Sequence, residues 1–128
     1  MAGVAGWDDY LVQLRCVIVD DDEAFCRAAQ ILLERDGMTV AGVAGSGAEA
    51  VTLVRALRPD VVLVDIRLGE ESGFAAARLL AGDGPAATLI MISSHAEDDY
   101  ADLIADSPAA GFLAKAELSA AAIRRILR

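Results

Sequence analysis

Residues 61–65 read Val61-Val62-Leu63-Val64-Asp65, which is a run of four branched aliphatic residues closed by an acid. An apolar run of this length predicts a β-strand that is buried on both faces. Strands of this kind occur in parallel sheets that are covered by helices on both sides. The stretch therefore indicates an α/β fold, and it leaves the Asp65 carboxyl group at the carboxyl end of the strand.

Working outward, four more strand-like runs alternate with segments of helical spacing. The expected strands are residues 16–19, 38–44, 88–92 and 111–114. The expected helices are residues 23–35, 47–57, 74–80, 97–105 and 118–127, with residues 69–73 and 82–85 read as a loop and a turn. Strands and helices that alternate with short connections predict a parallel sheet with helices on both faces. Ligands of such folds gather at the carboxyl edge of the sheet.

Local signals set several helix boundaries. Ser46 followed by Glu49 is the capping-box pattern of a helix start, and Arg58-Pro59 predicts the end of that helix. In the helix over 23–35, the residues assigned to the apolar stripe are Ala24, Phe25, Ala28, Ile31 and Leu32.

The size and composition of the chain exclude several classes of protein. Its 128 residues fit one domain over 14–128, preceded by a leader at 1–13 that shows no period. The net charge of −9 argues against a phosphate-backbone binder, so no nucleic-acid contact is expected. No apolar run approaches the roughly 18 residues of a membrane span, and no signal peptide is visible. A cytoplasmic protein is expected, with Cys16 and Cys26 as small buried hydrophobic residues.

Chemically useful residues stand at the end of four of the five expected strands. The first strand is followed by Asp20, Asp21 and Asp22; the others are followed by Asp65, by Ser93, and by Lys115. Because parallel strands end at one edge, these side chains are expected to meet.

This residue set suits phosphoryl transfer. Crowded carboxylates need a proton or a cation, and hard oxygen ligands suit Mg²⁺ or Mn²⁺. A carboxylate can also attack phosphorus, while a lysine and a hydroxyl neutralise the transferred group. Simpler interpretations stay open, since the three acids are typical helix caps, Ser93 is a typical cap, and Lys115 is a typical solvated lysine.

With these motifs in order, residues 14–127 resemble the receiver domain of response regulators. The resemblance lies in residues 17–22, 61–68 with Gly73, 91–94 and 111–115. It implies a flavodoxin-like (βα)5 doubly wound sheet of strand order 2-1-3-4-5. It also implies a two-component phosphoprotein whose partner is a sensor histidine kinase and which catalyses only its own phosphorylation and dephosphorylation.

The resemblance assigns a role to each motif residue. Asp65 would be the phosphoacceptor. Asp20 and Asp21, together with Asp65 and the backbone carbonyl of Arg67, would hold the cation. Ser93 and Lys115 would contact the phosphoryl group.

Two further pairs have implied roles. Ser93 and Phe112 match the switch residues, whose movement would change the surface formed by the fourth helix, the fifth strand and the fifth helix; Phe112 as plain core is the alternative. Arg67 and His95 flank the path of the hydrolytic water in receivers and would tune dephosphorylation, although a solvent-exposed histidine is the simpler interpretation.

The sequence departs from the family pattern at three positions. Gly69 and Ala116 each stand where proline is common, and Ser94 replaces a usual alanine. The changes suggest a more mobile loop at Gly69, a trans peptide before Ala116 and narrower access beside Ser94. None removes a reactive group.

Rival functions remain open. Asp20-x-Asp22 after a strand also suits phosphatases of the haloacid-dehalogenase type, although Glu23-Ala24 lacks their usual hydroxyl. A pseudo-receiver that only binds protein is the second rival, and a flavin-binding domain is a weaker third. The chain is expected to be a stand-alone regulator or a relative of transcription factors of the LuxR/NarL type. It would act through an unknown downstream protein or as a homodimer formed on phosphorylation.

Overall fold

The computed structural model describes residues 13–82 and 87–128, so the 1–13 leader, except Gln13, and most of the 82–85 turn lie outside the described residues. The main strands are β1 (Arg15–Val19), β2 (Thr39–Ala44), β3 (Val61–Asp65), β6 (Thr88–Ser93) and β7 (Gly111–Ala114). The α-helices are α2 (Glu23–Arg35), α3 (Gly47–Leu57), α4 (Gly73–Gly82), α5 (Ala101–Ala105) and α6 (Ala120–Leu127).

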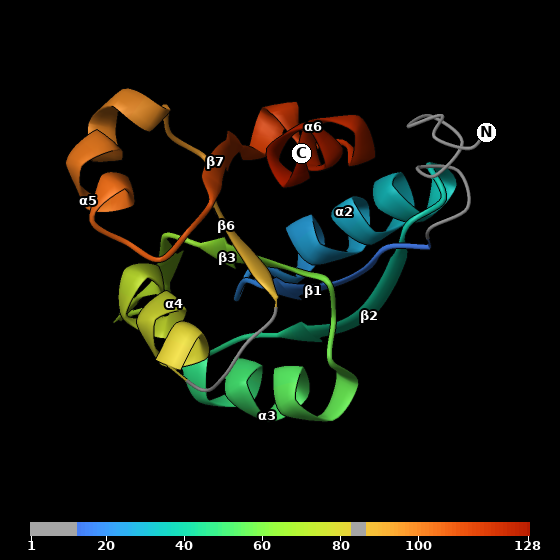
Figure 1. Cartoon of the computed structure of the whole chain (residues 1–128), viewed down its shortest axis with the longest axis horizontal. Coiled ribbons are helices and arrows are strands. Elements are labelled where there is room, and N and C mark those ends of the chain that lie inside the picture. Colours follow the sequence, from blue (N-terminus) through green and yellow to red (C-terminus); the bar gives the residue numbers. More distant parts are fainter. Residues whose placement is uncertain (1–12, 83–86) are drawn as a thin grey trace.

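The five main strands form one parallel sheet in the order β2-β1-β3-β6-β7, which confirms the predicted doubly wound topology. The strand quoted first, β3, lies in the middle, and all five of its residues are buried. Figure 1 shows α2 and α6 on one side of the sheet and α3 and α4 on the other. The register places Asp65 beside Ile92, and Ser93 beside Ala114.

Alternation along the strands divides the core into two layers. Ile18, Leu63 and Ile92 face the layer under α2 and α6. Val64 and Met91 face the opposite layer, under α3 and α4. This is the pattern of strands whose successive side chains point to opposite faces of a covered sheet.

The α2 helix has the predicted bounds but buries a different stripe. Its buried side chains are Cys26, Ala29 and Leu33. Ile31, which was assigned to the buried stripe, is 63% exposed. The helical spacing is confirmed, and Phe25 and Leu32 are half-buried, but the fully buried stripe lies one to two positions further along.

The start of α3 follows the predicted capping signal with one change. The Ser46 hydroxyl accepts a hydrogen bond from the Glu49 N–H at 3.2 Å, as in a capping box. The Glu49 carboxylate, however, accepts from the N–H of Gly45 rather than from that of Ser46. The helix ends at Leu57, and its C-cap Arg58 adopts a left-handed backbone with φ of 48° before Pro59.

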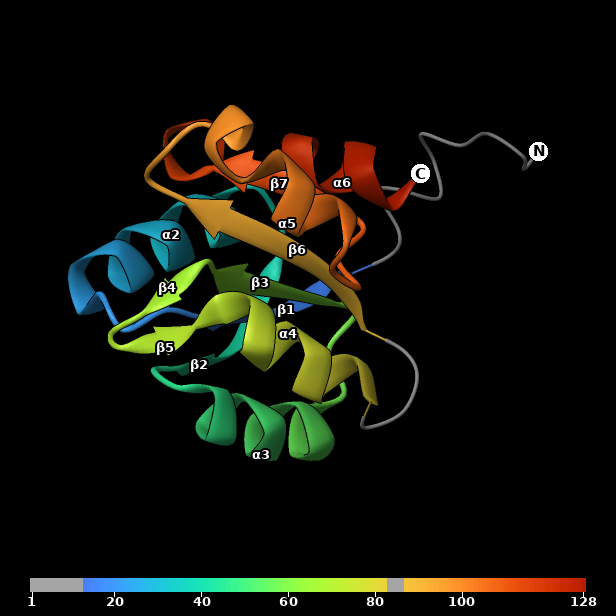
Figure 2. The same ribbon diagram turned by 90° about the vertical axis from the view of Figure 1, so that its left-hand side faces the viewer.

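The segment predicted as a loop at residues 69–73 is part of a small antiparallel hairpin. It consists of β4 (Arg67–Leu68) and β5 (Glu71–Ser72), joined through Gly69 at φ +61°. A proline could not adopt that φ, because its ring fixes φ near −65°. Figure 2 shows the hairpin leaving the edge at which β3 and β6 end.

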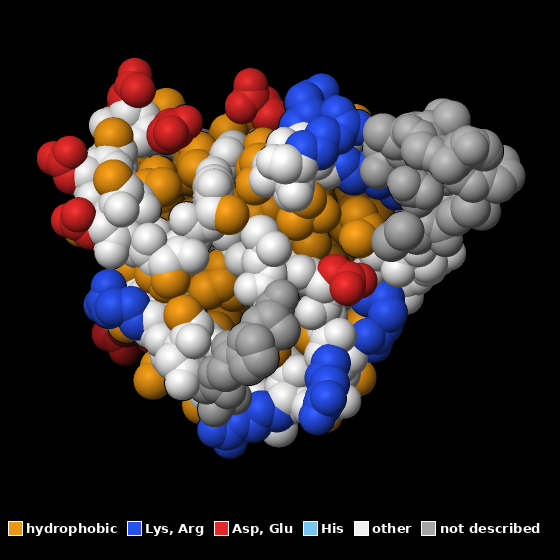
Figure 3. Space-filling view, in the orientation of Figure 1, with side chains coloured by type: hydrophobic (Ala, Val, Ile, Leu, Met, Phe, Trp, Pro, Cys, Tyr) orange, Lys and Arg blue, Asp and Glu red, His pale blue; other side chains and the backbone are white. Residues whose placement is uncertain are grey.

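The last two helical segments begin with short 3₁₀ turns. The segment expected as one helix over 97–105 is the 3₁₀ helix η1 (Glu97–Tyr100) followed by α5. In the same way, η2 (Lys115–Glu117) precedes α6, which begins at Ala120 behind the N-cap Ser119. Acidic side chains gather over η1 and α5 at the left of Figure 3.

Both cysteines are free and buried, as predicted. Burial raises the pKa of the Cys16 thiol to about 12 and that of Cys26 to about 11. The described residues contain no cis peptide bond, in agreement with the trans peptide expected before Ala116. Over residues 13–82 and 87–128, no helix has the length and apolar character needed to cross a bilayer.

Candidate functional site

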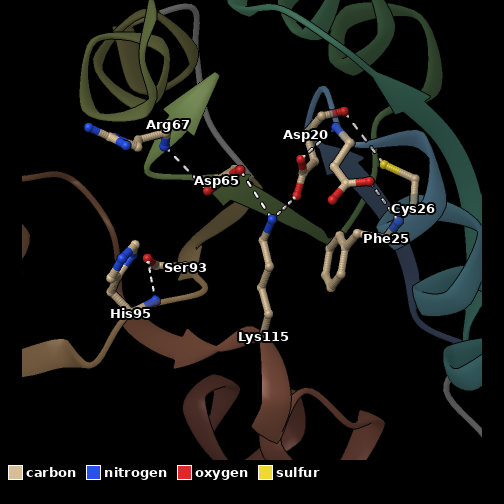
Figure 4. Close-up of polar contacts among 9 residues, drawn as sticks. Asp20, Phe25, Cys26, Asp65, Arg67, Ser93, His95 and Lys115 are labelled. Atoms are coloured by element: carbon tan, nitrogen blue, oxygen red, sulfur yellow. Dashed lines mark hydrogen bonds and ion pairs between the residues drawn. The ribbon is translucent and has the colours of Figure 1, made fainter. Parts of the chain in front are cut away.

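The predicted residues meet where the strands end. Asp20 follows β1, Asp65 closes β3, Ser93 closes β6, and Lys115 follows β7. Figure 4 shows the Lys115 side chain reaching between the carboxyl groups of Asp20 and Asp65. The sheet order explains the meeting, because β1, β3, β6 and β7 are consecutive neighbours.

The centre of the site is an ion triad of two carboxylates and one ammonium group. Lys115 Nζ lies 2.7 Å from Asp20 Oδ2 and 3.2 Å from Asp65 Oδ2. The Asp20 side chain is fully buried, whereas those of Lys115 and Asp65 are 14% and 12% exposed. Two negative groups therefore share one positive group, with Asp65 the carboxylate that solvent can reach.

The surroundings of the Asp65 carboxyl group raise its pKa. Burial and the neighbouring negative charge of Asp20 raise the pKa of Asp65 above its ordinary value. The Arg67 N–H, which donates to Asp65 Oδ1 at 3.2 Å, and the Lys115 ammonium oppose this rise. Burial acts to lower the pKa of Lys115, but hydrogen bonding and attraction to Asp20 and Asp65 outweigh it and raise that pKa.

The acids also form a donor set that fits a hard cation. Asp20, Asp21 and Asp65 each offer a carboxylate oxygen, and these three oxygens lie within 4.8 Å of one another. Asp21 is exposed, which gives a cation access from solvent. The buried Asp20 Oδ2 has one partner, the Lys115 ammonium group 2.7 Å away, and a carboxylate oxygen can accept a further contact. A carboxylate oxygen with spare capacity in a net negative cluster is what a divalent cation binds.

Asp22 serves the helix instead of the acid cluster. Its carboxylate caps α2 by accepting from the Phe25 N–H at 3.1 Å. Its own N–H donates to Asp20 Oδ1 at 2.9 Å. The cap interpretation is therefore right for the third acid of the run, while the first two take part in the cluster.

A hydrogen bond joins the Ser93 side chain to the backbone of His95. The Ser93 hydroxyl is buried and accepts a hydrogen bond from the His95 N–H at 3.0 Å. The His95 ring is exposed and meets Tyr100 edge-on, with the ring centroids 6.4 Å apart. In Figure 4 the Arg67 side chain extends away from Asp65, so its backbone is the part that touches the acid.

Phe112 lies on β7, three residues before Lys115 and beside Met91. It is half-buried and packs against the layer that also contacts Tyr100 and Ile104. Phe112 of β7 therefore borders the same core layer as residues of the η1–α5 segment.

Sequence reasoning missed the role of two residues in the site. A Cβ atom at Gly73 would stand 1.8 Å from the backbone oxygen of Asp65, so the position admits no side chain. The ring of Phe25 lies 4.4 Å from Lys115 Nζ. Gly73 is visible in the sequence as a glycine eight residues after the acceptor, whereas the Phe25 contact depends on how α2 sits against β7.

Comparisons with known proteins agree with this geometry. The profile of the family described as the response regulator receiver domain matches residues 16–128. Response regulator GacA of Pseudomonas viridiflava is 32% identical over 103 residues, which are 80% of this chain and 48% of that protein. The DNA-binding response regulator MtrA of Mycolicibacterium smegmatis is 36% identical over 90 residues, or 70% of this chain and 38% of that protein.

Solved structures are similar over most of the chain. A two-component response regulator of the LuxR family from Aurantimonas sp. SI85-9A1 gives a TM-score of 0.81 at 29% identity, covering 91% of this chain and 86% of that one. A response regulator from Burkholderia pseudomallei, solved with a phosphorylated aspartic acid, a calcium ion and citrate, gives 0.77 at 27% identity, covering 91% and 67%.

The curated relatives are longer proteins. The chain spans about half the length of GacA and less of MtrA. The family match itself covers nearly the whole of this chain. On the sheet order, the acid cluster and this match, the chain belongs to the response regulator receiver domain family.

Proposed function

We propose that Asp65 accepts a phosphoryl group from a sensor histidine kinase. The observation that carries this proposal is the environment of the Asp65 carboxylate, which is open enough to react and lies 3.2 Å from the Lys115 ammonium group. Mg²⁺ or Mn²⁺ would be held beside it by the carboxylates of Asp20, Asp21 and Asp65 and by the backbone carbonyl of Arg67.

The proposed step is an in-line displacement at phosphorus. A carboxylate oxygen of Asp65 forms a bond to the phosphorus atom, and the P–N bond of the donor phosphohistidine breaks. The leaving imidazole keeps the electron pair of that bond, and Asp65 becomes an acyl phosphate. When bound, the cation neutralises charge on the phosphoryl oxygens.

This chain's own residues would complete the neutralisation. Lys115 is placed to transfer its ammonium contact from the carboxylates to a phosphoryl oxygen. Ser93, whose hydroxyl oxygen accepts from the His95 N–H, would donate a hydrogen bond from its O–H to another phosphoryl oxygen. No external substrate is turned over, so the activity is limited to phosphorylation and dephosphorylation of the domain itself.

The movement of Ser93 suggests how the domain would switch. Ser93 lies beside Ala114, and Phe112 lies beside Met91 in the same pair of strands. We expect the half-buried Phe112 ring to turn inward as Ser93 moves, which would change the surface made by η1–α5, β7 and α6. That surface is proposed to bind the downstream protein or a second phosphorylated copy.

The residues at the mouth would set the lifetime of the acyl phosphate. Arg67 and His95 lie two residues past Asp65 and Ser93, and both side chains are exposed. Replacing both with alanine is expected to change the rate of dephosphorylation, measured by loss of the phosphoryl mass over time. An unchanged rate would remove this role from both residues.

The test of the proposed function is incubation with acetyl phosphate, with and without Mg²⁺, followed by intact mass measurement. We expect a gain of one phosphoryl group that requires Mg²⁺ and is absent from Asp65→Asn. The matched control is Asp102→Asn, at an exposed acid on α5, which should be modified like the unsubstituted chain.

The mass measurement, together with an assay of phosphate-ester turnover, separates the rival functions. A chain that gains no mass under any condition would be a protein-binding pseudo-receiver. Turnover of a phosphate ester that is lost in Asp20→Asn but kept in Asp65→Asn would indicate a phosphatase. The buried, ion-paired position of Asp20 argues against the phosphatase, because it leaves Asp65 as the more accessible carboxylate.

A further inference from the structure

One contact in the site comes from outside the acids, the serine and the lysine. The ring of Phe25 faces the Lys115 ammonium group, with 4.4 Å between Nζ and the ring centroid. An ammonium group over the face of an aromatic ring is attracted by the ring's negative quadrupole. Figure 4 shows the ring beside the end of the Lys115 side chain, on the side of Asp20 away from Asp65.

The position of Phe25 is fixed by the first turn of α2. Its N–H donates to the Asp22 carboxylate, which caps the helix. The next residue, Cys26, donates its thiol hydrogen to the backbone oxygen of Asp20 at 3.5 Å. Helical side chains lean toward the N-terminus, so a residue in this first turn leans back toward the end of β1. The half-buried ring also packs against the α2–α6 core layer.

Lys115 itself begins a short 3₁₀ turn and has a long flexible stem. Its ammonium group forms two ion pairs, at 2.7 Å with Asp20 Oδ2 and at 3.2 Å with Asp65 Oδ2. The ring supplies a third contact and, like the ion pair with Asp20, this contact is not altered chemically when Asp65 is modified. It therefore still constrains the ammonium group at the moment when Lys115 must exchange a carboxylate for a phosphoryl oxygen.

We propose that Phe25 is a positioning residue, whose ring face holds the Lys115 ammonium group over the acceptor during phosphoryl transfer to Asp65. This inference rests on the proposed function. The ring touches neither the phosphoryl group nor the acceptor, and it acts through Lys115 alone. The atoms exchanged in the step stay as given above, with the O–P bond formed at Asp65 and the donor's bond to phosphorus broken.

The first test compares side chains at position 25 by the rate of phosphorylation with acetyl phosphate and Mg²⁺. Phe25→Leu keeps an apolar side chain but has no ring face, and we expect the rate to fall about fivefold, the size of one partly desolvated cation–π contact. Phe25→Tyr keeps the face and should stay within about twofold of the unsubstituted chain. A purely structural role would not separate Leu from Tyr in this way.

A sharper version replaces Phe25 site-specifically with fluorinated phenylalanines. Each added fluorine withdraws electron density from the ring face while the shape of the ring changes little. The logarithm of the phosphorylation rate should fall steadily with the number of fluorines. Rates that do not follow fluorination, or a Leu variant as fast as the unsubstituted chain, would overturn the proposal.

The control is Leu14→Ala. Leu14 packs against the same core layer but lies just before β1, at the opposite edge of the sheet. It should reduce the resistance of the domain to urea and leave the phosphorylation rate unchanged. If this variant and Phe25→Leu slowed the reaction equally for the same loss of stability, the effect would be one of stability and the inference would fail.

A urea double-mutant cycle over Phe25→Leu and Lys115→Met tests the contact without any phosphoryl transfer. The two substitutions should be non-additive, because each removes the partner of the other. Absence of modification in the unsubstituted chain would sink the proposed function and this inference together. Modification at equal rates in the Phe, Leu and Tyr forms would sink this inference alone.

Discussion

Both edges of the sheet carry aspartate and basic side chains, but these residues have different roles at the two edges. At the amino edge, Asp60 stands before β3, and its carboxylate accepts from the Arg15 N–H at 2.9 Å. The Arg15 guanidinium donates to the backbone oxygens of Leu57 and Arg58, which end α3. At the carboxyl edge, Asp65 ends the same strand and shares the Lys115 ammonium with buried Asp20.

The difference lies in what the charges face. Asp60 is exposed, and its partners are backbone groups that join β1, β3 and β6. Asp65 and Asp20 are buried and repel each other, with one cation between them. Solvent can therefore offset the charge of Asp60, whereas the buried acids of the site share one ammonium group and keep a deficit of positive charge that a ligand can fill.

The largest expected effect on stability comes from substituting Gly73, the first residue of α4. Gly73→Ala would place a methyl group 1.8 Å from the Asp65 backbone oxygen. The clash is with rigid backbone, so we expect the free energy of unfolding to fall by about 3 kcal/mol or more. Gly82→Ala, at the other end of α4, meets nothing within 4 Å and is the matched control. Equal urea midpoints for the two variants would contradict the close approach at Gly73.

A smaller effect is expected from removing the cation of each edge. Lys115→Met leaves Asp20 and Asp65 without their shared partner and should lower the free energy of unfolding at neutral pH by about 2 kcal/mol. Arg15→Met at the amino edge loses only hydrogen bonds to carbonyl groups and should cost about 1 kcal/mol.

Repeating the unfolding of Lys115→Met and Arg15→Met with added Mg²⁺ tests where the cation binds. It should raise the urea midpoint of Lys115→Met more than that of the unsubstituted chain, because the cation then meets no competing ammonium group. Arg15→Met should respond to Mg²⁺ like the unsubstituted chain. A response of equal size in all three would show that the cation binds away from the Asp20–Asp65 pair.

The smallest effect is a gain in stability that depends on pH. The pKa of Asp65 is raised in the folded domain above its ordinary value of 3.8. Above both pKa values the folded state carries an ionised carboxylate that it disfavours; below both, the group is neutral in either state and the penalty is absent. Asp65→Asn should therefore stabilise the domain at pH 7, by about 1 kcal/mol.

Acidification provides the check on that sign. As the pH falls from neutral through the raised pKa of Asp65 toward its ordinary value, the advantage of Asp65→Asn over the unsubstituted chain should shrink toward zero. Asp60→Asn, at the other end of β3, should show no such gain at pH 7, as followed by urea unfolding at each pH. A gain that grows in acid would reverse the direction of the pKa shift.

Much of the architecture was predictable because it depends on local pattern. The buried run at residues 61–64 and the alternation of strands and helices predicted the parallel sheet, and the strand ends predicted that Asp20, Asp65, Ser93 and Lys115 would gather at one edge. The β4–β5 hairpin was not predictable from the sequence, because strands of two residues are too short to show an alternating hydrophobic pattern. The α2 stripe was misjudged because several apolar phases fit the same helix, and only packing selects Ala29 and Leu33 over Ile31.

By itself the sequence determined which residues have the chemistry and at which edge they stand, since strand direction and chain order suffice for that. Tertiary structure alone decided that Lys115 lies between two carboxylates and against the Phe25 ring. The physical reason is that these contacts join β1, α2, β3 and the end of β7, and their distances depend on how the layers pack, which no local pattern encodes.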